Sequence, residues 1–262
     1  MHYLRLYFRF FRQHLMGLIE YKVDFAIGVG SYLFRYFGEL AMLSLLFANI
    51  KELGGWSFPE VLFIYGFAAI PRALNLLLFD NIWLLPSRYV QEGDLDRLLV
   101  RPVNPFFHLL GERFGYDGFG VLGIAIAIII YAGGQLPYQF GVLDYLAFVL
   151  FALAGAFVYG ATNLLAASLA FWFVRVQELM QLVWSCNLFG TYPLNIFVKP
   201  VRYVFLFILP FAFTGFVPAT FFLRRNEYLP LAALALPVAL LFSVLAYLFF
   251  KKGLKRYGST GS

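Results

Sequence analysis

Four ionisable residues interrupt long apolar stretches of this 262-residue chain, and they are the side chains best placed to do chemistry inside a membrane. They are Arg35, Glu39, Arg72 and Asp80. An enzyme acting on lipid needs a base or nucleophile with a positioned partner, and none stands at a convincing spacing. Arg35 and Glu39 lie four residues apart and can pair on one helix face. Two interpretations stay open: these charges line a polar route or subunit seam, or they are structural pairs that hold helices in register.

The other reactive groups form no catalytic constellation. The three histidines fall outside the predicted hydrocarbon core, and Cys186 is alone, so we expect no intrachain disulfide and no metal site. A Walker A loop needs Gly-Lys followed by Ser or Thr. No lysine of the chain follows a glycine: Lys22, Lys51, Lys199, Lys251, Lys252, Lys255. We therefore expect no P-loop ATP hydrolysis and no cofactor in this chain, which we interpret as a non-enzymatic subunit.

A charged run between residues 92 and 105 is the most polar island of the sequence. Asp94 can cap a short helix, and Leu95, Leu98 and Leu99 fall on one face of it. Pro102 pushes the preceding residue out of helical geometry and so ends the helix. The pattern predicts a short stub that presents leucines to a soluble partner.

Composition places the rest of the chain in lipid. Hydrophobic residues make up 62% and charged residues 13%, whereas about a quarter of an average soluble protein is charged. The formal net charge of +6 is spread among aromatic residues and makes no basic patch, so we expect no nucleic acid partner. The sequence therefore predicts an all-α, polytopic membrane protein that forms a single transmembrane domain over residues 1–262.

Six stretches are long enough to cross a hydrocarbon layer about 30 Å thick. They are Phe25 to Ala48, Phe58 to Leu78, Phe114 to Ala132, Val142 to Phe173, Glu178 to Tyr192 and Leu229 to Phe250. Residues 1–24 alternate apolar and basic faces and predict an interfacial helix. Residues 193–223 are broken by prolines and predict an external re-entrant segment before the last helix. A proline-kinked helix followed by a short loop is the alternative for that segment.

Positive charge sets the predicted orientation, since short cytoplasmic loops are rich in Lys and Arg. With an even number of crossings, both termini and the 87–105 region lie on the cytoplasmic side, together with the cluster Lys251 to Arg256. A full span over residues 201–223 would make the number of crossings odd and place that cluster on the external side. The charge pattern therefore favours six crossings.

These features together resemble the membrane subunit of type-2 ABC exporters, in particular the compact six-span bacterial permeases. The run Glu92-Gly93-Asp94-Leu95-Asp96-Arg97-Leu98-Leu99-x-x-Pro102 is similar to the E-G-(S/T/D)-L-(D/E)-x-L-L-x-x-P element of that family, and R-P-V-N-P follows at Arg101 to Pro105. The resemblance covers nearly the whole chain.

The resemblance implies a coupling helix in residues 87–105 that docks on cytosolic ABC ATPase subunits, which bind the ATP and Mg. Its residues are Glu92, Gly93, Asp94, Leu95, Asp96, Arg97, Leu98, Leu99, Arg101 and Pro102, with the three leucines as the apolar contact. It also implies a connecting helix in residues 1–24, a second permease, identical or sister, and a bacterial inner-membrane location. The substrate path would pass Arg35, Glu39, Arg72 and Asn187.

Three functions remain open at this level. The first is an export subunit that carries an amphiphilic substrate of unknown identity and is powered by the separate ATPase. The second is a membrane-embedded lipid-modifying enzyme, and the third is a channel or scaffold that does not pump. Only the first gives the charged stub a purpose.

Overall fold

A computed structural model describes residues 22–224 and 226–258, and this part of the chain is helical, with no β-strand. The interfacial helix predicted over residues 1–24 lies almost wholly outside the described residues. Five helices are long: α2 (Lys22–Asn49), α3 (Phe58–Phe79), α6 (Asp117–Gly134), α7 (Val142–Ser168) and α12 (Ala235–Leu254). The all-α class is confirmed, and these helices begin within a few residues of the predicted stretches, except that α11 (Leu229–Ala233) precedes α12.

Four helical segments of the described chain are long and apolar enough to cross a membrane. They are Phe58–Gln91, Asp117–Gly134, Val142–Phe171 and Asn226–Leu254. The α2 helix is not among them although its 28 residues extend about 42 Å. Arg35 and Glu39, in its middle, lower its hydropathy. The protein is therefore a multi-pass membrane protein, and the first and fifth predicted spans need a separate argument.

The predicted fifth stretch, Glu178–Tyr192, is not one continuous α-helix. The helix α8 (Gln177–Ser185) has nine residues and gives way to the 3₁₀ segment η4 (Cys186–Thr191). Pro193 follows and cannot donate a helical hydrogen bond. Gly190 lies directly against the Phe211 carbonyl, where any larger side chain would clash. Close packing at Gly190 therefore accompanies the break.

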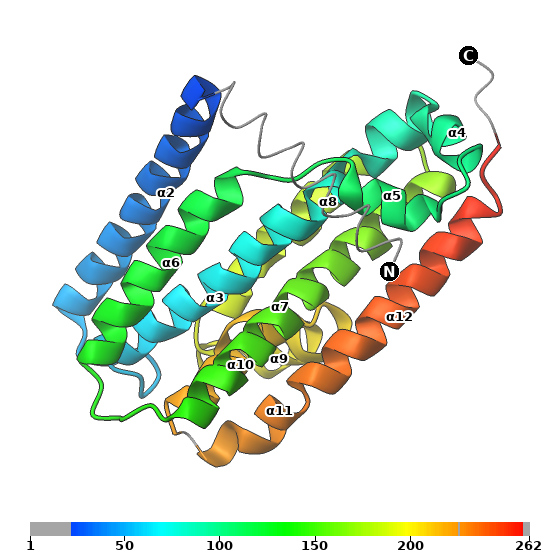
Figure 1. Ribbon diagram of the computed structural model, residues 1–262. Helices are drawn as coiled ribbons and strands as arrows, with labels where there is room; N and C mark the ends of the chain where they lie inside the picture. The colour runs from blue at the N-terminus through cyan, green and yellow to red at the C-terminus, as the bar shows by residue number, and fades with distance from the viewer. Residues whose placement is uncertain (1–21, 225, 259–262) are drawn as a thin grey trace.

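The bundle has two distinct ends, which Figure 1 shows at the top right and bottom left of the ribbon. The α4 end carries the short helices α4 (Asp94–Leu99) and α5 (Pro105–Gly111), and α7 and α12 finish there, with Trp172 and Phe249 stacked at 5.0 Å. The Trp56 end carries the turn between α2 and α3. Gly28 packs against Asp117, so α2 and α6 start side by side toward the α4 end.

Helix α3 is the centre of the bundle. All residues from Glu60 to Ala73 are buried, and the Glu60 carboxylate accepts a hydrogen bond from the Ser57 backbone N–H, which caps the helix start. Pro71 lies inside the helix and meets Gly155 of α7, where an added Cβ would come within 2.7 Å of the proline ring. Only a glycine lets α7 cross α3 this closely.

The segment 193–223 enters and leaves at the same end of the molecule. It contains η5 (Leu194–Ile196), α9 (Lys199–Tyr203), the π-helical η6 (Val204–Ile208), the 3₁₀ turn η7 (Phe211–Thr214) and α10 (Phe216–Phe222). The Trp56 Nε1–H donates to Asn195 Oδ1 at 3.0 Å, and its ring lies 6.1 Å from that of Tyr228. Between these points, Phe211 reaches Tyr159 in the middle of α7 at 5.6 Å.

Candidate functional site

The short helix α4 begins at a glycine. Gly93 is its N-cap with φ of 84°, a left-handed conformation that side chains other than glycine rarely adopt. Asp94 is therefore the first helical residue and not the cap, which corrects the sequence prediction. Its carboxylate instead accepts from Arg88 Nε at 2.7 Å. That ion pair ties α4 to the π-helical segment η2 (Leu85–Gln91), which continues α3.

The three leucines of α4 do not share one environment. Leu95 and Leu98 are 1% and 0% exposed and pack into the chain's own core beside Tyr89 and Leu109. The prediction that they face a partner is corrected, because their apolar face is already covered by the permease core. Leu99 is 42% exposed and Val100 83% exposed. The apolar surface open to a partner is therefore Leu99 and Val100.

The charged residues around α4 form a connected network. Arg97 Nη2 lies 2.5 Å from Glu112 Oε1 and 3.8 Å from Asp94. The other Glu112 oxygen accepts from the Tyr89 hydroxyl at 2.8 Å, and Asn81 Nδ2 donates to that hydroxyl at 2.8 Å. These bonds join α4, η2, the start of η1 (Asp80–Leu84) and the residue after α5 into one unit.

The outer side of this unit carries exposed apolar and charged residues. Exposed side chains are Glu92, Arg97, Leu99, Val100, Arg101 and Pro102. Asp96 is half-buried, and Arg101 also contacts the buried His108 on α5. Two apolar residues flanked by charged ones are thus held rigidly at one end of the bundle. Such a surface can accept a mechanical load from a docked protein.

The charged residues predicted in or beside the membrane spans behave differently. Arg35 Nε and Glu39 Oε1 form the predicted pair at 2.8 Å, and the second Glu39 oxygen accepts from the Tyr65 hydroxyl of α3 at 2.5 Å. Asp80 pairs with Arg113 at 3.0 Å. Two of the deep acids are therefore structural partners of other side chains.

Arg72 has no such partner among residues 22–224 and 226–258. It is 4% exposed, and its Nε and Nη2 atoms have no hydrogen-bond acceptor. The Trp184 ring of α8 covers its guanidinium at 5.4 Å. Tyr36 and Tyr159 lie within electrostatic range, each buried. The structure thus surrounds Arg72 with α2, α7 and α8.

Asparagines extend this polar interior. Asn75, one turn along α3 from Arg72, accepts from Asn163 of α7 at 3.3 Å. Asn187 lies one turn beyond Trp184, is 3% exposed, and its Nδ2 has no acceptor within the described chain. Of the four predicted path residues, Arg35 and Glu39 pair directly, whereas no hydrogen bond joins Arg72 to Asn187 in the described chain.

Sequence reasoning missed several members of this cluster. Tyr36, Tyr65, Asn75, Tyr159 and Trp184 were not singled out. One signal was available, since Arg72 and Asn75 are three residues apart and Tyr159 and Asn163 are four apart, so each pair lies on one helix face. In the described part of the chain, no group of three His, Cys, Asp or Glu side chains is arranged to hold a metal.

Comparison with known families decides the class of protein. The family model described as ABC-2 family transporter protein matches residues 33–261. The chain belongs to this ABC-2 transporter family. Neither a curated protein nor a solved structure matches it. The predicted ABC permease identity is thus confirmed, and the match takes in α4, Arg72 and the 193–223 segment.

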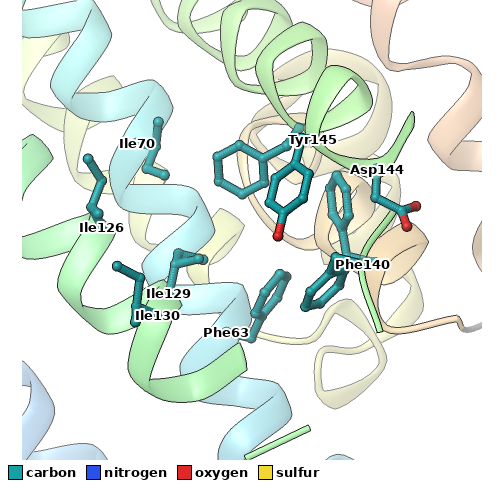
Figure 2. Close-up of a pocket in the computed structure, with 10 residues that line it drawn as sticks. Phe63, Ile70, Ile126, Ile129, Ile130, Phe140, Asp144 and Tyr145 are labelled. Carbon is teal, nitrogen blue, oxygen red and sulfur yellow. The ribbon is translucent and has the colours of Figure 1, made fainter. Parts of the chain in front are cut away.

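An apolar pocket of this permease lies away from Arg72. It encloses about 170 Å³ between α3, α6 and α7, and its lining residues are Phe63, Ile70, Ile126, Ile129, Ile130, Phe140, Asp144, Tyr145, Phe148 and Phe222. Figure 2 shows the Tyr145 hydroxyl pointing into it and the Asp144 carboxylate pointing away. That carboxylate is held by the Gly141 N–H and by Arg224 at 2.7 Å. The pocket suits hydrocarbon and offers no chemistry.

Proposed function

We propose that this permease is the membrane subunit of an ABC exporter, forming the substrate path and coupled to a separate cytosolic ATPase that binds ATP and Mg. One observation carries the proposal. A surface of exposed apolar and charged residues on α4 is locked by buried leucines and ion pairs onto the continuation of α3. Membership of the ABC-2 family supports it.

Force applied to α4 has a direct route into the bundle. Leu95 and Leu98 anchor α4 to the core, and Arg88 joins it to η2. The apolar helical segment Phe58–Gln91 runs from there through Arg72 to the opposite end. Pro71 removes one helical hydrogen bond in its middle and allows a bend there. Closure of the ATPase would thus tilt the half of α3 that carries Arg72.

We further propose six crossings with both termini cytoplasmic in the bacterial inner membrane. Helix α2 supports the first crossing, since it starts beside Asp117 and ends at the turn before Trp56. The fifth would run through α8 and η4, because Met180 packs in the core of the α4 end and Asn195 bonds to Gly54. Arg88, Arg97 and Arg101 in and around α4 and the basic cluster Lys251 to Arg256 favour a cytoplasmic α4 end.

The segment 193–223 would then be re-entrant from the outer side. Its two flanks meet at Trp56, and its tip contacts Tyr159 deep in the bundle. Irregular backbone at membrane depth must be buried in protein or line a wet cavity. Phe211, Ala212, Phe213 and Thr214, at the tip, are all buried. This burial satisfies the condition.

A second permease subunit, identical or sister, would complete the path along α2. The Arg35 and Glu39 side chains are 43% and 25% exposed in the single chain. A charged pair facing lipid at this depth is costly, so a protein surface or water must cover it. Amphiphilic substrate would move along this face between the two subunits.

The experiment compares two matched charge insertions at opposite ends. Leu99→Asp with Val100→Asp changes the exposed α4 surface, whereas Lys51→Asp changes an exposed residue at the Trp56 end. Each variant is co-purified from native membranes with its ABC ATPase. We expect the α4 variant to lose the ATPase or its substrate-dependent ATP turnover and the Lys51 variant to keep both. Equal turnover in the two variants would refute the coupling role.

A further inference from the structure

Arg72 is a buried cation whose Nε and Nη2 atoms find no acceptor in the described chain, and several neighbouring groups are also donors without acceptors. We infer that Arg72 and this surrounding cluster bind the anionic group of the transported amphiphile, a phosphate, sulfate or carboxylate attached to a hydrocarbon tail. The inference rests on the proposed export function and adds the class of its substrate.

The cluster has a surplus of donors. Arg72 Nε and Nη2 and, one turn along α3, Asn75 Nδ2 are buried and lack acceptors among the described residues, and so does Asn187 Nδ2, three residues after Trp184. Guanidinium and amide NH₂ groups can only donate. The Tyr36 hydroxyl is also buried and unbonded there. An oxyanion has several lone pairs and no proton to give, so it complements this set.

The nearby carboxylates do not neutralise Arg72. Glu39 is bonded to Arg35 and Tyr65, and Asp80 to Arg113. A structural arginine buried in a membrane protein normally has its own carboxylate or carbonyl partner. Arg72 instead meets the face of Trp184, which attracts the cation but accepts no hydrogen bond. Its hydrogen-bonding atoms remain for a ligand.

Trp184 covers Arg72 on the side from which the ligand would enter. Its side chain is half-buried on the short helix α8, and its neighbours Gln181, Leu182 and Ser185 are exposed. Rotation of one indole ring would open Arg72 to that face. The exposed Leu182 then offers an apolar surface for the tail of the amphiphile.

Binding of dodecyl phosphate to the purified permease–ATPase complex in phosphatidylcholine nanodiscs tests the inference. We expect saturable binding that Arg72→Gln weakens by roughly 10- to 100-fold, as loss of hydrogen bonds to a charged group predicts. Arg113→Gln, which removes an arginine already paired with Asp80, should leave binding unchanged. Equal binding by wild type and Arg72→Gln overturns the inference.

Two further probes separate the sources of the anion. Dodecyl maltoside carries the same tail without a charge, and inorganic phosphate carries the charge without a tail. We expect neither to compete with dodecyl phosphate at matched concentration. Competition by inorganic phosphate at equal affinity overturns the amphiphile assignment, and competition by the maltoside overturns the anion assignment.

Thermal unfolding of the ligand-free protein distinguishes a binding role of Arg72 from a structural one. Arg72→Gln should raise the melting temperature, because it removes an unpaired buried charge, whereas Arg113→Gln should lower it. A fall in both overturns the inference, and Arg72→Lys repeats the binding test should the glutamine variant not fold. If binding of dodecyl phosphate proves non-specific while ATP turnover still depends on α4, only this inference is refuted. If ATP turnover does not depend on α4, the proposed function is refuted.

Discussion

The α4 end and the interior around Arg72 treat the same side chain in opposite ways. At the α4 end, Arg88, Arg97 and Arg113 each have a carboxylate within 3.0 Å. In the interior, Arg72 is more deeply buried than any of them and has no carboxylate among the described residues. These three arginines are thus paired where pairing contributes least, whereas Arg72 has no pair where an unpaired charge costs most.

The paired and the unpaired arginines affect stability in different ways. Ion pairs near water are individually weak, typically about 0–1 kcal/mol, but a network of them fixes the position of α4. An unpaired arginine in the bundle destabilises the empty protein, and such a cost is expected at a binding site. The proposals accordingly assign load transmission to the α4 end and ligand binding to the interior.

The largest expected effect distinguishes the buried from the exposed leucine of α4. Leu98→Asp buries a charge at a fully covered position and should cost more than the roughly 2–5 kcal/mol of a core Leu→Ala change. Leu99→Asp, at a 42% exposed position, should stay within about 0.5 kcal/mol. Thermal unfolding of both variants measures the difference. Similar losses would mean that α4 does not pack as described.

A smaller effect should follow from removal of Glu112. Its carboxylate serves Arg97 and the Tyr89 hydroxyl together, so Glu112→Ala leaves both without an acceptor. We expect a loss of about 1–3 kcal/mol. Chemical denaturation gives the value, and Glu92→Ala on the exposed face is the matched control. The network interpretation fails if both variants behave alike.

A double-mutant cycle on Arg72 and Trp184 addresses the interior. Trp184→Leu alone should destabilise the permease by about 1 kcal/mol, since it removes the ring that covers the guanidinium. In an Arg72→Gln background the same change should cost less, and the difference is the coupling energy. Strictly additive melting temperatures would show that the ring does not stabilise the cation.

The smallest effect concerns Arg97 at the surface. Its side chain is 44% exposed, so Arg97→Ala should cost less than about 1 kcal/mol, and the cost should shrink in high salt. Unfolding at low and high ionic strength measures both. A large, salt-insensitive loss would place this pair in a drier environment than the structure gives it.

The sequence predicted most long helices because apolar length and caps are local properties. The Phe58 and Val142 starts were placed correctly, since Glu60 caps the first and Gly141 precedes the second. The fifth stretch was predicted less well: Pro193 is a local signal for its end, but the change from α8 to η4 accompanies packing of Gly190 against Phe211. No local signal in a single chain reports a contact over that separation.

In the candidate site, too, local features were predicted from the sequence and features that depend on packing were not. Helical spacing correctly placed Arg35 beside Glu39, but it put all three leucines of α4 on one face. Spacing could not tell that Leu95 and Leu98 face the permease core while Leu99 turns outward, because that depends on where α5 and η2 lie. The isolation of Arg72 likewise depends on Arg35 and Arg113 occupying the nearby acids.

One cysteine measurement tests the central claim, which is that α4 is a cytoplasmic surface that receives a load from an ATPase. Val100→Cys is introduced after Cys186→Ala removes the native thiol, with Lys51→Cys as the control at the Trp56 end. We predict that a membrane-impermeant maleimide labels the Val100→Cys variant only from the cytoplasmic side and that bound ATPase protects it, whereas the Lys51→Cys variant is labelled from outside. Labelling of the Val100→Cys variant from the external side would contradict the account.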